Sequence, residues 1–134
     1  MENRHADAQC LIVGDGDVLI RNALAEYLRH CGYKVIEGAN SDEVLTALRR
    51  GTASADAVLA DAELAGSINA FELRIRLRKE FPAITTILAG SVDAAANAAG
   101  QLCDDGPHLR RPYEPEKVVA HIKRLLAAVK RQAP

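Results

Sequence analysis

The chain has 134 residues, of which 49% are hydrophobic and 26% are charged, and its formal net charge is -1. These values are typical of a single globular domain, and they exclude a disordered chain and a basic protein that coats nucleic acid or an anionic membrane. The sequence has no signal-peptide pattern and no apolar stretch long enough to cross a bilayer. We therefore expect one cytoplasmic domain over residues 1–134, with its core at about residues 9–130.

The cysteines do not form a recognisable framework. The chain has three cysteines, Cys10, Cys31 and Cys103, and no Cys-x-x-Cys pair. An odd count without such a pair indicates neither a disulfide framework nor a zinc site. We expect all three to be small buried hydrophobic residues. The four histidines are scattered, and none has metal-ligand spacing from a cysteine.

The first half of the chain alternates strand and helix patterns. The apolar run at residues 10–13 predicts a strand, and apolar residues about four apart from Ile20 to Cys31 predict a helix that ends at Gly32. Residues 33–38 then alternate like a second strand. Residues 40–50 begin with capping residues and carry one apolar face, which predicts a second helix.

The second half continues this alternation. Residues 56–60 and 84–90 are typical of buried strands, and residues 70–81 form an amphipathic pattern before Pro82. The alanine-rich residues 91–102 predict a helix with a weak apolar face. Residues 108–113 predict a short fifth strand, and residues 115–131 a final helix.

Five strands alternating with five helices indicate an α/β fold with a doubly wound parallel sheet. In the flavodoxin-like strand order 2-1-3-4-5, the first and third strands are neighbours at the point where the order reverses. Loops beyond the carboxyl ends of strands usually carry the functional groups in such sheets. We therefore expect Asp15 and Asp61 to lie close together.

The stretch "LIVGDGDVLIR" allows two opposite interpretations. A glycine-rich turn can hold a phosphate, but the third glycine of a dinucleotide motif falls on Leu19, and only Glu37 offers a ribose-binding acid. A pocket of carboxylates would instead repel phosphate and attract a divalent cation. The simpler alternatives are that Asp15 is a turn residue and that Asp61 caps a turn or helix.

Four segments carry a resemblance to a known family: "LIVGDGDVLIR", "ADAVLADAEL", "ITTILAGS" and "LRRPYEPEKVVAHIKRLL". In order and spacing they resemble the receiver domains of bacterial two-component response regulators, which are signalling domains rather than enzymes. The resemblance implies that Asp61 is the phosphoacceptor and that Asp15 is the first acid of a Mg²⁺ pocket. It also matches Pro112 to the proline of the family's Lys-Pro pair and implies a cis bond before it.

The same comparison exposes several departures from the family pattern. The second acid of the metal pocket is replaced by Gly16, with Asp17 following, and the switch hydroxyl is replaced by Gly90, with Ser91 one residue later. Arg111 stands where the family has a lysine, and His108 stands where it commonly has an aromatic residue. The metal ligands implied by the resemblance are Asp15, Asp61 and Glu63, through its backbone or side chain, with Asp17 as a further candidate. The groups expected to contact phosphate or to act as the switch are Arg111, Ser91, Gly90 and His108.

Two functions remain open at this point. One is a phosphoacceptor in a phosphorelay, with an altered metal pocket that binds Mg²⁺ weakly or not at all. The other is a pseudo-receiver, a protein-protein interaction module that works without phosphorylation. The implied partners are a histidine kinase or phosphotransfer protein and a separate output protein, with a homodimer compatible with either function. We expect no direct contact with nucleic acid or membrane.

The resemblance also suggests where a partner binds. In the family, partners commonly contact the fourth helix, the fifth strand and the last helix. Here the weak apolar face of the fourth helix would leave small residues such as Ala95 and Ala99 exposed for such a contact. His108, in place of the usual aromatic residue, would make contact at this face sensitive to pH.

Overall fold

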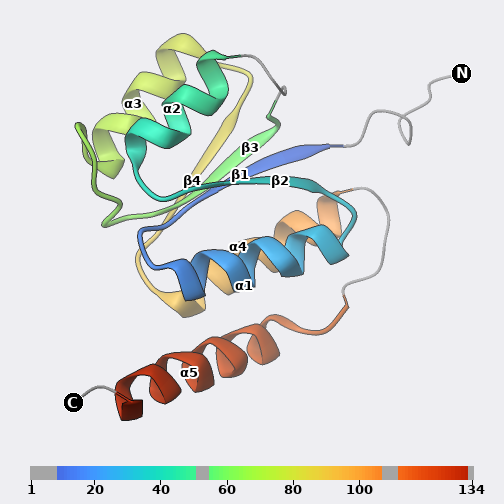
Figure 1. Cartoon of the computed structure of the whole chain (residues 1–134). Helices are drawn as coiled ribbons and strands as arrows, with labels where there is room; N and C mark the ends of the chain where they lie inside the picture. Colours follow the sequence, from blue (N-terminus) through green and yellow to red (C-terminus); the bar gives the residue numbers. More distant parts are fainter. Residues whose placement is uncertain (1–8, 51–54, 107–111, 133–134) are drawn as a thin grey trace, which may run out of the picture.

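The computed structural model describes residues 9–50, 55–106 and 112–132 of the chain. Figure 1 shows a central sheet with helices on both of its faces. The strands are β1 (Cys10–Gly14), β2 (Lys34–Gly38), β3 (Ala57–Asp61) and β4 (Thr85–Ala89). The helices are α1 (Val18–His30), α2 (Ser41–Arg49), α3 (Ala70–Glu80), α4 (Val92–Asp105) and α5 (Pro115–Gln132).

All strand pairs in the sheet are parallel, in the order β2-β1-β3-β4. Gly14 at the end of β1 pairs with Gly38 on one side and with Ala60 on the other. The α/β flavodoxin-like class is confirmed, and β1 and β3 are neighbours as expected. Asp15 and Asp61 therefore follow adjacent strands at the same edge of the sheet.

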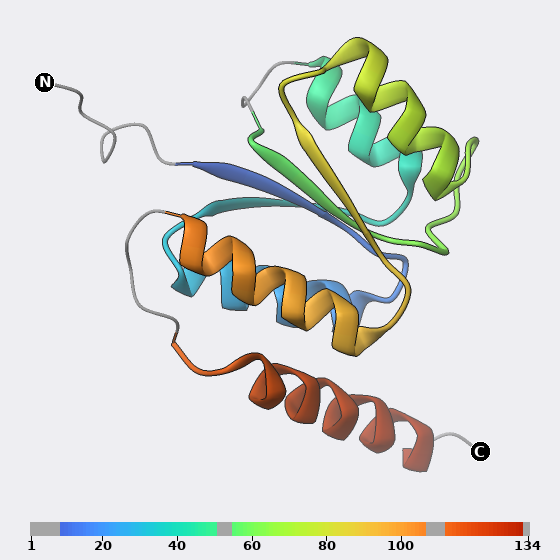
Figure 2. The same cartoon turned by 180° about the vertical axis from the view of Figure 1, so that it is seen from behind.

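The sheet has four strands within the described residues, where five were expected. Of the residues assigned to the fifth strand, 108–111 lie outside the described part. A right-handed crossover that extended the sheet beyond β4 would place α4 on the same face as α3. Instead α4 lies beside α1 on the opposite face, and α2 and α3 share the other (Figures 1 and 2). In the described residues, the position of α4 thus differs from the one that the expected strand order 2-1-3-4-5 requires.

Helix boundaries follow the capping residues in the sequence. The side chains of Asp17, Asn40, Asn69 and Ser91 each accept a hydrogen bond from a backbone N–H in the first turn of the following helix. Such bonds satisfy N–H groups that have no partner inside the helix. Gly32 follows α1 with φ of 102°, a left-handed conformation that favours glycine.

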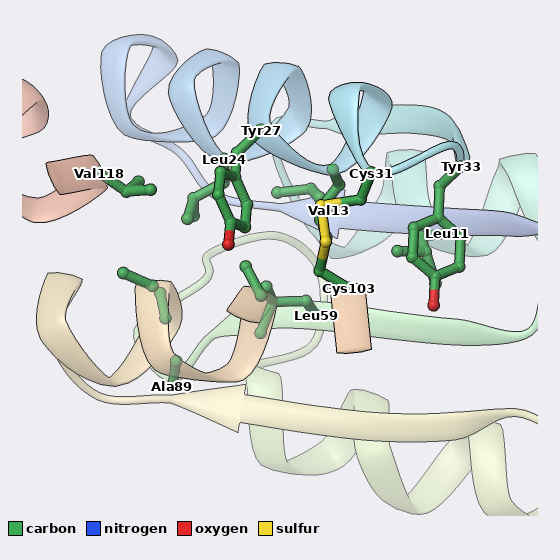
Figure 3. Packing of buried hydrophobic residues seen from close by; sticks show 14 of the residues in the cluster. Leu11, Val13, Leu24, Tyr27, Cys31, Tyr33, Leu59, Ala89, Cys103 and Val118 are labelled. Atoms are coloured by element: carbon green, nitrogen blue, oxygen red, sulfur yellow. A yellow bond between two sulfur atoms is a disulfide. The ribbon is translucent and has the colours of Figure 1, made fainter. Parts of the chain in front are cut away.

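Alternation of side chains along the strands divides the core into two clusters. Leu11, Val13 and Leu59 face α1 and α4, and Val118 and Ile122 of α5 join this cluster (Figure 3). Ile12 and Val58 point to the other face, where α2 and α3 cover them. The strands are buried on both faces, as in most parallel sheets. The helix α5 lies against α1 and α4 on their side away from the sheet (Figures 1 and 2).

The expectation that no disulfide forms is wrong. Cys31, which caps the end of α1, is bonded to Cys103 in the last turns of α4, with their Cα atoms 5.4 Å apart (Figure 3). The two cysteines are 72 residues apart in sequence, and only the packing of α4 on α1 brings them together. Cys10 remains a buried free thiol, as expected, and burial raises its pKa.

The small residues of α4 also lie in an unexpected place. Ala95, Ala96 and Ala99 are buried, together with Gly100. Small side chains allow the α4 backbone to come close to α1 and the sheet, so they belong to the core. A partner-binding role for exposed Ala95 and Ala99 is therefore excluded.

Among the residues that the structure describes, no helix combines the length and apolarity needed to cross a membrane.

Candidate functional site

A small cavity of about 140 Å³ lies at the carboxyl edge of the sheet. Its polar lining comes from Asp15 after β1, Asp61 at the end of β3 and Ser91 before α4. The rest of the lining is mostly apolar and comes from the strand ends and from α1 and α4: Val13, Gly14, Ile20, Leu24, Leu59, Ala60, Ala89, Val92 and Ala95. The structure thus brings together two of the predicted acids and one predicted hydroxyl.

Asp15 is a buried carboxyl group in this cavity, with 7% of the residue exposed. Burial raises its pKa to about 6, while a hydrogen bond from the Asp17 N–H opposes this shift and the negative charge of Asp61 adds to it. A carboxylate held out of water beside a second one is unfavourable without a compensating cation. The site therefore has an electrostatic reason to bind positive charge.

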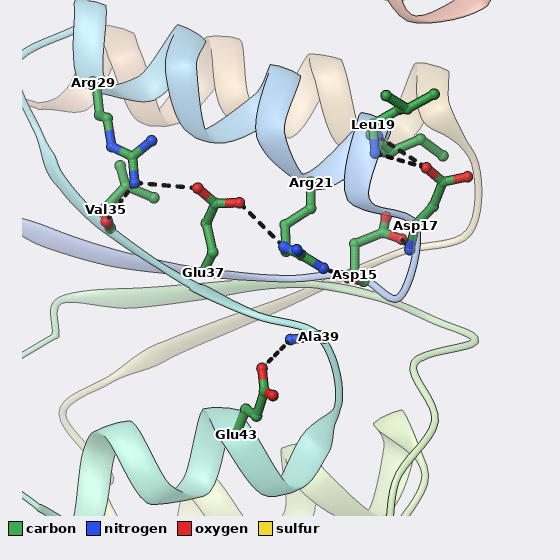
Figure 4. A network of polar contacts seen from close by, with 10 residues as sticks. Asp15, Asp17, Leu19, Arg21, Arg29, Val35, Glu37, Ala39 and Glu43 are labelled. Atoms are coloured by element: carbon green, nitrogen blue, oxygen red, sulfur yellow. Dashed lines mark hydrogen bonds and ion pairs between the residues drawn. The ribbon is translucent and has the colours of Figure 1, made fainter. Parts of the chain in front are cut away.

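Arg21 contacts the turn that carries Asp15, and Glu37 holds Arg21. Arg21 was not singled out from the sequence, and Glu37 was considered only as a ribose-binding acid. The Arg21 guanidinium donates from Nη1 to the Asp15 carbonyl oxygen at 2.9 Å and from Nε to Glu37 Oε1 at 3.1 Å (Figure 4). Arg29 donates to the other oxygen of Glu37 at 3.3 Å. Glu37 is thus engaged by two arginines, which removes it as a ribose-binding acid and with it the dinucleotide interpretation.

Asp61 ends β3 in a half-buried position and lines the cavity. The Glu63 backbone N–H donates to Asp61 Oδ1 at 3.2 Å, and the Leu64 N–H donates to the Asp61 carbonyl oxygen at 3.0 Å. Glu63 itself is exposed, and it does not line the cavity. The structure therefore shows Glu63 contacting Asp61 through its backbone, with its side chain outside the cavity.

Asp17 does not line the cavity that Asp15 and Asp61 share. Its Oδ1 accepts from the backbone N–H groups of Leu19 at 2.9 Å and Ile20 at 3.3 Å, and it caps α1 (Figure 4). Within residues 9–50, 55–106 and 112–132, no group of three or more His, Cys, Asp or Glu side chains is arranged to hold a metal. Two carboxylates remain, Asp15 and Asp61. Mg²⁺ is often held by one or two carboxylates with water in its other positions, so this pair fits Mg²⁺ with few protein ligands.

Gly16 and Gly90, which the resemblance matches to an acid and a hydroxyl residue, leave room for side chains. A Cβ atom at Gly16 would meet only the Ala39 carbonyl oxygen, at 3.7 Å, and one at Gly90 would meet nothing within 4 Å. The Ser91 hydroxyl oxygen accepts from the Ala94 N–H at 3.0 Å and caps α4. His108, Arg111 and the bond between Arg111 and Pro112 lie outside the described residues, so their predicted roles stay predictions.

Comparison with known proteins gives a consistent set of structural neighbours. A putative response regulator from Chloroflexus aurantiacus is 28% identical, covers 90% of this chain and 98% of its own, and has a TM-score of 0.54. A CheY-like response regulator receiver domain from Methanospirillum hungatei is 19% identical, covers 94% and 99%, and has a TM-score of 0.57. The chain therefore has the fold of response regulator receiver domains. No family model and no curated protein matches the sequence.

A further neighbour bears on the chemistry of the receiver fold. A response regulator from Thermotoga maritima, solved with Mg²⁺ and a beryllium fluoride, is 28% identical and has a TM-score of 0.55. The match covers 60% of this chain and 68% of that one. Receiver domains are generally signalling domains rather than catalytic ones. In the present chain, Asp15 and Asp61 lie at the carboxyl edge of the sheet.

Proposed function

We propose that this receiver domain accepts a phosphoryl group on Asp61 in a phosphorelay. The observation that supports this most directly is the shared cavity, in which Asp15 and Asp61 come from adjacent strand ends and Ser91 stands at the start of α4. The half-buried Asp61 carboxylate is accessible enough to act as a nucleophile. Burial chiefly raises the pKa of Asp15, the negative charge of Asp61 adds to the shift, and a bound cation would offset both effects.

In the proposed reaction, a carboxylate oxygen of Asp61 forms a bond to the phosphorus atom of a phosphohistidine on a histidine kinase or phosphotransfer protein. The phosphorus–nitrogen bond breaks, and the imidazole nitrogen keeps the electron pair and takes up a proton. When bound, Mg²⁺ would neutralise charge on the phosphoryl oxygens. Asp15 and Asp61 would hold it, and the Glu63 N–H orients the accepting carboxylate.

Ser91 is the group in the described residues that could report phosphorylation. Its hydroxyl oxygen accepts the α4 capping bond, and its hydrogen is available to donate to a phosphoryl oxygen. Movement of Ser91 toward Asp61 would act directly on α4, which it caps. A separate output protein would then read the change through α4 or its neighbours.

A pseudo-receiver remains the second candidate, because two observations favour it. The described residues contain no cluster of three metal-binding groups, and the Asp17 carboxylate accepts the capping hydrogen bonds of α1. In that case the domain would work as a phosphorylation-independent interaction module with the same scaffold.

Incubation with acetyl phosphate and Mg²⁺, followed by intact-protein mass spectrometry, separates the two candidates. We expect the wild type to gain the mass of one phosphoryl group and Asp61→Asn to gain none. Asp15→Asn should label more slowly, because it removes half of the proposed cation site. No labelling of the wild type, or equal labelling of Asp61→Asn, would reject the phosphoacceptor and leave the pseudo-receiver.

A further inference from the structure

The turn between β1 and α1 is held at three points around Asp15. The Asp15 N–H donates to the Gly38 carbonyl oxygen at 3.0 Å, and Asp15 Oδ1 accepts from the Asp17 N–H at 2.9 Å. The third contact is the bond from Arg21 Nη1 to the Asp15 carbonyl oxygen at 2.9 Å. Of these three, only the Arg21 contact comes from a side chain other than that of Asp15, so only it can be removed while every atom of the turn is kept.

The turn needs such support for two reasons, the conformational freedom of Gly16 and the charge of Asp15. Gly16 follows Asp15 and has no side chain to anchor it, so this backbone is intrinsically free to reorient. The Asp15 carboxylate is buried near Asp61, and both desolvation and like-charge repulsion favour its movement toward water. A bond that fixes the Asp15 carbonyl group opposes that movement.

Arg21 is itself held in place. Its side chain is 16% exposed, and Nε donates to Glu37 at the end of β2. The carboxyl end of β2 therefore contacts the Asp15 turn in two ways. The Gly38 carbonyl oxygen accepts a hydrogen bond from the Asp15 N–H, and Glu37 holds Arg21, which donates to the Asp15 carbonyl oxygen (Figure 4). The planar guanidinium suits this double task, because two of its donors can serve two acceptors at once.

We propose that Arg21 is a positioning residue that keeps the Asp15 carboxylate directed into the cavity beside Asp61. The proposal concerns the same site as the proposed function and, for its effect on cation binding, rests on it. Arg21 acts through Asp15 and does not line the cavity itself. Glu37 serves this arrangement by orienting Arg21.

The chain offers a matched control in Arg29. Like Arg21 it lies on α1 and pairs with Glu37, but its second contact is the Val35 carbonyl oxygen at 3.0 Å, away from Asp15. Both Arg21→Ala and Arg29→Ala therefore remove one ion pair with Glu37. Only Arg21→Ala removes a contact with the acid turn.

The first readout is hydrogen exchange of the Asp17 amide, measured by NMR without any metal. Because this N–H is bonded to Asp15 Oδ1, its protection reports the orientation of the carboxylate. We expect exchange about tenfold faster in Arg21→Ala, the scale of one lost hydrogen bond, and unchanged in Arg29→Ala. Arg21→Lys, which keeps one charged donor, should fall between them and serves if Arg21→Ala does not fold. Equal protection in the wild type and in the folded Arg21 variant would overturn the proposal.

The second readout is Mg²⁺ affinity, measured from the change in the NMR chemical shift of the Asp17 amide during a Mg²⁺ titration. We expect the Mg²⁺ dissociation constant to rise about fivefold or more in Arg21→Ala, partial recovery in Arg21→Lys, and no change in Arg29→Ala. An equal loss in both alanine variants would contradict positioning and show a general effect of the Glu37 ion pairs. If the wild type binds no Mg²⁺ and Asp61 takes no phosphoryl group, the proposed function fails, while the metal-free exchange rates still decide the role of Arg21.

Discussion

The two ends of the α1–α4 pair differ sharply in what they contribute. At the end where both helices begin, Asp15 and Asp61 line a cavity with their negative charges close together. At the end where both helices finish, Cys31 is bonded to Cys103, and the Tyr33 hydroxyl donates to the Leu102 carbonyl oxygen. One end carries an unfavourable arrangement of charge that a bound cation would relieve, and the other joins the helices covalently. A binding site can remain strained when the elements around it are fixed elsewhere.

Breaking the disulfide should have the largest effect on this balance. The bond closes a loop of 72 residues, and losing a constraint of that length costs about 4 kcal/mol in the chain-entropy model. We expect Cys103→Ala to lower the free energy of unfolding by about that amount in urea titrations under oxidising conditions. Reduction of the wild type should have a similar effect.

Cys10→Ala is the matched control for this experiment, because Cys10 is also buried but forms no disulfide. It should lose only the packing of one sulfur atom and the weak hydrogen bond that the Cys10 thiol donates to the Leu11 carbonyl oxygen, and it should respond to reduction as the wild type does. If Cys103→Ala and Cys10→Ala were equally destabilised and reduction had no effect, the covalent link between α1 and α4 would not form in solution.

Removing the charge of Asp15 should stabilise the protein at the other end. Since burial raises the folded-state pKa of Asp15 to about 6 from its ordinary value of 3.8, the ionised form is disfavoured on folding. We expect Asp15→Asn to raise the free energy of unfolding by about 1–3 kcal/mol at pH 7. The difference from the wild type should shrink as the pH falls from 6 to 4, because the wild-type carboxyl group then takes up a proton in the folded state first.

Asp17→Asn tests whether this gain is specific to the buried position. Asp17 is exposed, and asparagine keeps the oxygen that caps α1. The free energy of unfolding of Asp17→Asn should stay close to that of the wild type both at pH 7 and at pH 4. A gain equal to that of Asp15→Asn would mean that general charge repulsion, and not burial of Asp15, sets the balance.

Most of the fold could be predicted from local patterns, because strand and helix periodicity and capping residues such as Asn40 act over a few residues. The disulfide could not, since Cys31 and Cys103 meet only after α4 has packed on α1. The alanines of α4 misled in the same way. A face of small residues looks weakly apolar in sequence, yet it permits close packing.

The candidate site was predicted in part. The placement of Asp15 and Asp61 follows from strand order, which the alternation of elements indicates. The directions of the Asp17 and Glu63 side chains do not follow from it, because each is set by local hydrogen bonds or exposure to water. Arg21 was also missed, although an arginine four residues after Asp17 in a first helical turn could have suggested a contact with the preceding turn.

Adding a third carboxylate should sharpen the contrast between the two ends. Gly16 has room for a side chain, so we expect Gly16→Asp to bind Mg²⁺ at least about tenfold more tightly, or about 1.4 kcal/mol. Gly16→Asn has nearly the same size without the charge and should gain much less. Calorimetric titration would measure both, and no gain in Gly16→Asp would show that the glycine does not limit the affinity.

Glu63→Ala should have the smallest effect on the same titration. The Glu63 side chain is exposed and outside the cavity lining, and its backbone contact with Asp61 survives the substitution. We expect a Mg²⁺ dissociation constant within about twofold of the wild type, since no ligand is removed. A tenfold loss would mean that the Glu63 carboxylate turns into the site when the cation binds.

The dependence of the thermal unfolding midpoint on Mg²⁺ concentration, at constant ionic strength, tests most directly whether Asp15 and Asp61 act as one site. A cation that binds only the folded state stabilises it by mass action. The account predicts that Mg²⁺ raises the midpoint of the wild type and leaves those of Asp15→Asn and Asp61→Asn nearly unchanged. An equal rise in all three proteins, or no rise in the wild type, would contradict a shared cation site at the ends of β1 and β3.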